Sequence, residues 1–124
     1  MIGGRVLDAS ALTAFASGRS VRAAALMWTA VQEDLVLVVP ATALAAGWSA
    51  LPESHHDVLT VLLHLPVTVV DDLTAGRARE VGVLPADPLD AHALLCARDR
   101  GWVLVSADAA RYVHAGGVEV EQLP

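Results

Sequence analysis

Residues 87–112 read DPLDAHALLCARDRGWVLVSADAARY, and this stretch decides the fold. Asp87, followed by proline, is typical of a helix start, because an Asp side chain caps free backbone N–H groups and proline suits the first turn. Gly101 is typical of a helix end, and the apolar WVLV after it predicts a buried strand. The stretch also places two carboxylates, Asp90 and Asp108, where a helix and a loop begin.

Outside this stretch, apolar runs alternate with segments of helical spacing. The predicted strands are residues 5–8, 35–39, 67–70, 102–105 and 118–120. The predicted helices are residues 9–16, 21–33, 41–51, 54–65, 75–81 and 88–100, with one further helical turn at 109–113. Strands that alternate with helices imply right-handed crossovers, so we expect an α/β fold with a mostly parallel, doubly wound sheet.

The length and composition are those of a single small domain. A chain of 124 residues has the usual length of one domain, so we assign residues 1–124 to a single domain. No apolar run reaches the length of a membrane span, and the segment MIGGRVLDAS lacks the apolar core of a signal peptide. The lone Cys96 cannot form an internal disulfide, which fits a reducing compartment. We therefore expect a cytoplasmic protein.

The charge of the chain opposes diffuse binding to nucleic acid. The net charge is −6, and the chain has no lysine, so every fixed positive charge is an arginine. Proteins that bind phosphate backbones broadly present a basic face. If this chain binds nucleic acid, it must do so locally, through a metal ion or a few arginines.

Several conspicuous side chains are given ordinary structural roles. Five residues of 21–33 recur at three- and four-residue steps and are predicted to face the core: Val21, Ala24, Ala25, Trp28 and Val31. The tryptophans at 28, 48 and 102 are predicted to fill core rather than stack on bases, and Cys96 is predicted to be a small core residue. We expect His92 on an exposed helix face, and the pair His55 and His56 on a solvated one.

Three aspartates fall where an open parallel sheet forms its sites, beyond the carboxyl ends of the strands. Asp8 ends the first predicted strand, Asp108 follows the fourth, and Asp90 opens a helix. Each could instead be a helix or turn cap, and Asp90 stands three residues after Asp87, as in a capping-box variant. Carboxylates gathered at one edge repel each other unless a hard cation lies among them. Mg²⁺ or Mn²⁺ prefers such ligands and can activate water against a phosphodiester.

These residues resemble the PIN domain, the fold of VapC-type toxin ribonucleases. The matching pieces are VLDASAL near the start, VVP before the third helix, DAHALLCARDRGWVLVSADAARY and the closing VEV, in an order that covers nearly the whole chain. The resemblance implies a three-layer α/β/α sandwich with a five-stranded sheet and Mg²⁺- or Mn²⁺-dependent cleavage of RNA. It also implies a homodimer and a small antitoxin whose tail covers the acidic site.

Carried over residue by residue, the resemblance implies three metal-binding catalytic carboxylates and two hydroxyls that orient them. These are Asp8, Asp90 and Asp108, with Ser10 and Ser106. The family's remaining carboxylate, normally a Glu in the third helix, falls on Ala46, or by a slip of one residue on Ala45 or Gly47. A missing carboxylate weakens metal affinity and the positioning of the attacking water.

Two functions follow from this pattern. The first is a metal-dependent endoribonuclease, the toxin of a toxin–antitoxin pair, with activity weakened by the missing Glu. The alternative is a degenerate, non-catalytic PIN-fold module that binds RNA or protein, which the missing Glu and the acidic net charge favour. A response-regulator-like domain that takes phosphate on Asp is a third option, but its pocket usually contains a lysine, and this chain has none.

Overall fold

The computed structural model describes residues 3–124 and contains one five-stranded sheet. The strands are β1 (Gly4–Leu7), β2 (Val36–Pro40), β3 (Thr68–Asp71), β4 (Val103–Ser106) and β5 (Val120–Gln122). Their order is β3-β2-β1-β4-β5, and each neighbouring pair is parallel. The predicted α/β fold with a parallel five-stranded sheet is confirmed, and the strand bounds differ from the predicted ones by one or two residues.

Helices connect the strands in the predicted order. They are α1 (Ala9–Ala16), α2 (Val21–Glu33), α3 (Ala41–Ala50), α4 (His56–Leu63), α5 (Ala75–Gly82) and α6 (Pro88–Arg100). Short 3₁₀ turns, η1 (Glu53–His55) and η2 (Ala109–Tyr112), precede α4 and follow β4. The ends of α6 are set by local chemistry: the Asp87 carboxylate accepts from the Leu89 N–H, and Gly101 adopts the left-handed conformation at φ 67°. Within residues 3–124, no helix has the length and apolarity needed to cross a membrane.

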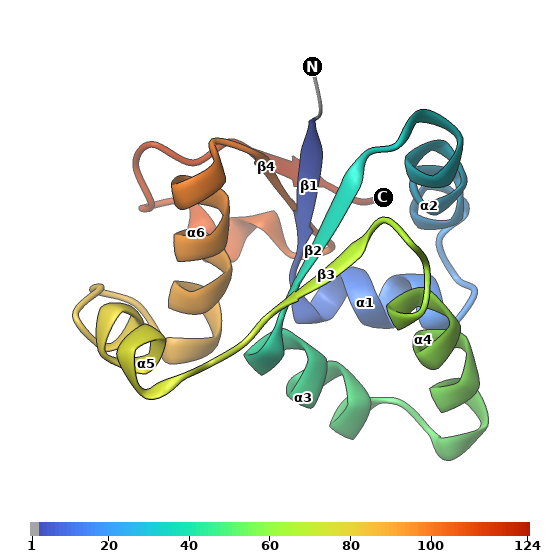
Figure 1. Cartoon of the computed structure of the whole chain (residues 1–124), viewed down its shortest axis with the longest axis horizontal. Helices are drawn as coiled ribbons and strands as arrows, with labels where there is room; N and C mark the ends of the chain where they lie inside the picture. Colours follow the sequence, from blue (N-terminus) through green and yellow to red (C-terminus); the bar gives the residue numbers. More distant parts are fainter. Residues whose placement is uncertain (1–2) are drawn as a thin grey trace.

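The sheet is covered on both faces, which makes three layers. Successive strand residues point to opposite faces, so Leu7, Leu37 and Val105 pack with α1, α2 and α4. Their neighbours Val6, Val38 and Leu104 pack on α6 instead. Figure 1 shows α5 and α6 on one side of the strands and α1, α2 and α4 on the other.

The core-facing prediction for α2 is wrong. Val21 is 86% exposed and Trp28 is 69% exposed, and the other predicted stripe residues also face solvent. The buried face consists of Ala23, Met27 and Ala30. This helix carries apolar residues at helical spacing on two faces, and the face with the smaller side chains packs into the core that it shares with α1. Trp28 therefore does not fill core.

The other two tryptophans also lie at the surface to different degrees. Trp48 is exposed and stacks on His56, with ring centroids 4.0 Å apart. Trp102 is half-buried and lies against Gly4 of β1, where a side chain would collide with the indole ring. The predicted core role is therefore wrong for Trp48, while Trp102 packs against the sheet.

Candidate functional site

The three predicted carboxylates lie around one small cavity. Asp8 follows β1, Asp90 lies in the first turn of α6, and Asp108 begins η2 after β4. All three line a cavity of about 70 Å³, together with Ser10, Arg111 and Tyr112 among others. Since β1 and β4 are parallel neighbours, their carboxyl ends deliver Asp8 and Asp108 to the same edge of the sheet.

Asp8 is held by three hydrogen bonds. Its Oδ1 accepts from the Ser10 hydroxyl at 2.7 Å and from the Ala11 N–H at 2.9 Å, so it caps α1 as the alternative reading proposed. Its Oδ2 accepts from the Tyr112 hydroxyl at 2.7 Å. Burial, with the negative charge of Asp8, raises the pKa of Tyr112, so this hydroxyl stays protonated and remains a donor. Asp8 is therefore both a buried structural anchor and a wall of the cavity.

Asp90 is paired with a cation from the same chain. The Arg111 Nε donates to Asp90 Oδ1 at 3.0 Å, and this hydrogen bond with the charge of Asp90 raises the pKa of Arg111. Asp87 caps α6, while the Asp90 side chain is turned to Arg111 and into the cavity. The cap-only alternative for Asp90 is therefore not what the structure shows.

Asp108 is the most accessible of the three carboxylates. It is exposed, and within residues 3–124 its carboxylate accepts no hydrogen bond, so it does not cap η2. The loop that carries it is fixed by two hydroxyls: Ser106 accepts from the Asp108 N–H at 2.9 Å, and Ser10 accepts from the Ala107 N–H at 2.8 Å. The two hydroxyl oxygens lie 3.2 Å apart. The Ser10 and Ser106 hydroxyls thus fix the position of this loop, and Ser10 also fixes the orientation of the Asp8 carboxylate.

Sequence reasoning missed Arg111 and Tyr112 as site residues. They lie three and four residues after Asp108, a spacing that returns them to the same side of a helical turn. That spacing was the available signal, although it does not by itself tell a site residue from a packing residue.

The donor set suits a hard divalent cation. Three carboxylates offer only oxygen ligands, and Mg²⁺ commonly binds through one or two carboxylates while keeping several waters. Within the described chain, only Asp71, His92 and Cys96 form a trio of possible ligands whose atoms all lie within 4.8 Å of one another. Asp8, Asp90 and Asp108 do not form such a trio.

The face of α3 that carries Ala46 is turned toward α6. Thr42, one turn earlier on the same face, bonds the ring of His92 on α6 at 2.8 Å. Gly47 instead faces α1, where a Cβ would lie 3.5 Å from Leu12 Cβ, and Ala45 is exposed. Of the three positions considered for the family Glu, Ala46 is therefore the one on the α6 side, and it is half-buried.

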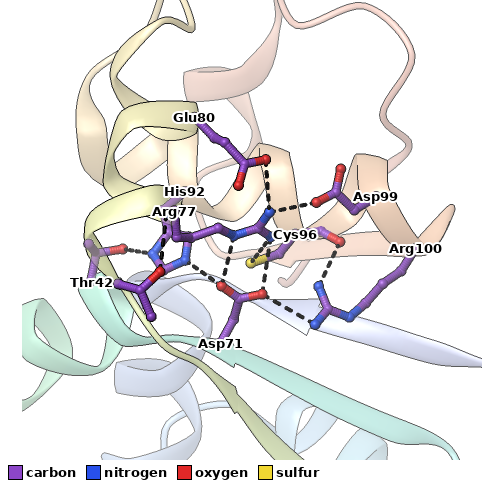
Figure 2. A network of polar contacts seen from close by, with 9 residues as sticks. Thr42, Asp71, Arg77, Glu80, His92, Cys96, Asp99 and Arg100 are labelled. Carbon is purple, nitrogen blue, oxygen red and sulfur yellow. Dashed lines mark hydrogen bonds and ion pairs between the residues drawn. The ribbon is translucent and has the colours of Figure 1, made fainter.

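His92 is fully buried, so the prediction of an exposed helix face is wrong. Its Nε2 lies 2.9 Å from Asp71 Oδ1, and its other ring nitrogen meets Thr42 (Figure 2). The helix pattern could not reveal this, because the partner carboxylate comes from the end of β3, far away in sequence. Cys96, one turn further along α6, is buried as predicted.

Asp71 is the centre of this second cluster. Arg77 donates to both of its oxygens at 3.0 and 3.1 Å, and Arg100 donates at 3.2 Å (Figure 2). Burial alone would raise the pKa of Asp71, but the hydrogen bonds from His92 and Arg77 outweigh it and lower the pKa from 3.8 to about 2. The carboxylate is thus charged and fastens β3, α5 and α6 together.

This cluster is a poor metal site despite its ligand types. Burial raises the pKa of the Cys96 thiol to about 12, so the sulfur is not the thiolate that a metal needs. Two guanidinium groups already occupy the Asp71 carboxylate and would repel a cation. The cluster is a structural network, separate from the acidic cavity.

Comparison with known proteins identifies the fold. No family model matches the sequence, and no curated protein matches it. Among solved structures, the chain is similar to one from VapBC2 of Rickettsia felis, determined bound to a DNA fragment from the promoter, with a TM-score of 0.70 and 14% identity over 100% of both chains. The likeness establishes that the chain has the PIN-like α/β fold that the resemblance implied.

Proposed function

We propose that this chain is a metal-dependent endoribonuclease of the PIN type and the toxin of a toxin–antitoxin pair. The observation that carries the proposal is the cavity at the carboxyl ends of β1 and β4, lined by Asp8, Asp90 and Asp108. The shared fold with the VapBC2 structure supports the same assignment. Such a cavity suits phosphodiester chemistry, which needs a concentrated anionic site for a divalent cation.

Each site residue has a task that follows from its contacts. Asp8, Asp90 and Asp108 would hold Mg²⁺ or Mn²⁺, which when bound activates a water and offsets charge at the phosphate. Tyr112 and Ser10 keep Asp8 in one orientation through their hydroxyl donors. Arg111 uses its Nε on Asp90, which leaves its terminal N–H groups available to a substrate phosphate.

The proposal includes protein partners. A small antitoxin that covers the acidic site and a second copy of the chain are the partners that the resemblance implies. The exposed apolar side chains of α2, with Trp28 at their centre, support a protein partner on that helix, because exposed apolar patches of this kind commonly mark interaction sites.

A second candidate is a non-catalytic PIN-fold binding module. Ala46 puts a methyl group on the α6-facing side of α3, where the family has a carboxylate, and Arg111 neutralises one of the remaining three. Both features lower the affinity of the cavity for a cation. Calorimetric titration with Mn²⁺ separates the candidates, because tight binding that disappears in Asp90→Asn counts against the non-catalytic module.

RNA cleavage with Mn²⁺ or Mg²⁺ tests the nuclease directly. Asp108→Asn is the sharpest variant, because the Asp108 carboxylate is exposed and makes no structural hydrogen bond within the described chain. Asp57→Asn, an exposed acidic residue on α4, is the matched control. We expect cleavage that EDTA abolishes, a loss of roughly a hundredfold in Asp108→Asn, no change in the control, and a gain in Ala46→Glu.

Two outcomes would contradict the proposal. Cleavage that survives in Asp108→Asn as well as in the control would point to a contaminating nuclease. If neither the wild-type chain nor the Ala46→Glu variant cleaves RNA with Mn²⁺, the nuclease proposal fails and the non-catalytic binding module becomes the favoured function.

A further inference from the structure

We propose that the acidic cavity is the middle of a continuous trough for single-stranded nucleic acid, with the strand's phosphates held by Arg19 on one side and Arg98 on the other. The inference rests on the proposed function for why a strand lies there. It goes beyond that function by assigning a path and binding residues outside the acidic cavity.

Three cavities lie in series because neighbouring ones share wall residues. A cavity of about 430 Å³ between α1 and the start of η1 shares Ser10 with the acidic cavity. A second, of about 510 Å³ beside α6, shares Asp90 and Arg111 with it. The outer two have the size of ordinary ligand pockets, while the central one, of about 70 Å³, is too small for a nucleotide. A backbone that follows these shared walls from one outer cavity to the other would pass the acidic cavity.

The first outer cavity combines one cation and several polar groups with apolar residues such as Leu51 and Pro52. Arg19 supplies its positive charge, and no Asp or Glu side chain lines it. Thr13, Ser17 and His55 also line it, and the two hydroxyls donate to the backbone carbonyls of Ser10 and Ala14. The Arg19 guanidinium is a donor of the kind that contacts phosphate oxygens in nucleic-acid complexes.

The second outer cavity combines cations with an apolar floor. Arg98 and Arg111 line it together with the carboxylates of Asp87 and Asp90, and Asp90 and Arg111 also line the acidic cavity. Leu94 and Leu84 form part of its floor, which suits an unstacked base. An apolar floor under cationic edges is an arrangement that single-strand binding proteins use to hold bases and phosphates together.

The arginines divide into those that pair with a carboxylate and those that form no ion pair. Arg77 and Arg100 are held by Asp71, and Arg111 by Asp90. Arg19 and Arg98 form no ion pair with any residue of the described chain, and Arg98 donates only to the Gly116 carbonyl, at 3.4 Å. The net charge of −6 repels phosphate groups. Arg19 and Arg98 provide a local positive charge in the two cavities that flank the acidic one.

The test is binding in EDTA, so that it does not depend on cleavage. A labelled single-stranded RNA of about ten nucleotides is titrated by fluorescence anisotropy with the wild-type chain, with the double variant Arg19→Gln/Arg98→Gln, and with Arg22→Gln/Arg79→Gln. The control pair removes the same charge from exposed positions on α2 and α5 that line none of the three cavities.

We expect the trough variant to bind more weakly by up to about twenty-fivefold, since each exposed charge pair contributes up to about fivefold. The slope of log affinity against log salt should fall by about 0.7 for each lost phosphate contact. The control should bind within about twofold of wild type. Equal losses of affinity in both variants would mean that RNA is attracted diffusely, and would overturn the proposed trough. Unchanged affinity in the trough variant would also overturn it, and would favour a protein segment as the ligand of these cavities. If the chain does not cleave RNA but its RNA binding still depends on Arg19 and Arg98, the nuclease proposal fails and the trough proposal stands.

Discussion

Replacing Asp71 by Asn is expected to destabilise the fold by about 2–4 kcal/mol near neutral pH. The Asp71 side chain is 10% exposed and accepts from His92, from Arg77 twice and from Arg100. The asparagine amide would present an N–H₂ group where one carboxylate oxygen now accepts, so at least one charged donor would lose its partner. The lowered pKa of Asp71, about 2 against 3.8, corresponds to about 2 kcal/mol of stability. Loss of hydrogen bonds to a charged group, at about 1.5–3 kcal/mol each, accounts for the upper part of the range.

Urea unfolding followed by circular dichroism measures this change, with Asp72→Asn as the control. Asp72 is the next residue, is exposed and makes no ion pair within residues 3–124, so its change should stay within about 0.5 kcal/mol. The pKa of Asp71 is lower in the folded chain than in the unfolded chain. Its contribution is therefore full above about pH 4 and disappears as the pH falls through about 2. The difference between wild type and Asp71→Asn must shrink over that window. A difference that stays constant down to pH 2, or one no larger than that of Asp72→Asn at pH 7, would refute the reasoning.

Two further substitutions test other parts of the structure. Tyr112→Phe removes the hydroxyl that donates to Asp8 at 2.7 Å and should cost about 1–3 kcal/mol in urea unfolding; a loss below 0.5 kcal/mol would show that this hydrogen bond does not anchor Asp8. Gly4→Ala should cost about 1–3 kcal/mol, because its Cβ would lie 2.8 Å from Trp102 Cδ2 and closer still to other ring atoms. Gly3→Ala, whose Cβ would lie 3.6 Å from Leu35, should be nearly neutral by the same measurement, and similar losses in both would argue against the indole contact.

The elements of this fold were predictable where the signal is local. Ser20 caps α2 by accepting from the Ala23 N–H, and Asp87 and Gly101 bound α6, because each acts through its own backbone neighbourhood. The apolar run after Gly101 becomes β4 for the same kind of reason, since a continuous apolar run requires cover on both faces. These cues lie within a few residues of the features they set.

The wrong predictions of burial share a different cause, because whether a side chain is buried depends on which other elements pack against it. Trp28 and Ala23 both lie at helical spacing on α2, and only the position of neighbouring elements such as α1 decides that the small residue faces inward. His92 looked like a surface residue because its partner, Asp71, lies at the end of a strand 21 residues earlier. Periodicity describes one element at a time and therefore cannot choose between faces or find partners across the fold.

The contacts of the acidic cavity indicate which carboxylate has most to gain from a cation. Asp8 has three donors from its own chain, and Asp90 has Arg111 and the start of α6, where the helix dipole favours negative charge. Three carboxylates and one guanidinium leave a formal charge of −3 + 1 = −2 at the cavity. Asp108 accepts no hydrogen bond within residues 3–124 and relies on solvent. Under the proposed function, cation affinity should therefore depend more on Asp108 than on Asp90, because a bound ion would displace no protein donor from the Asp108 carboxylate.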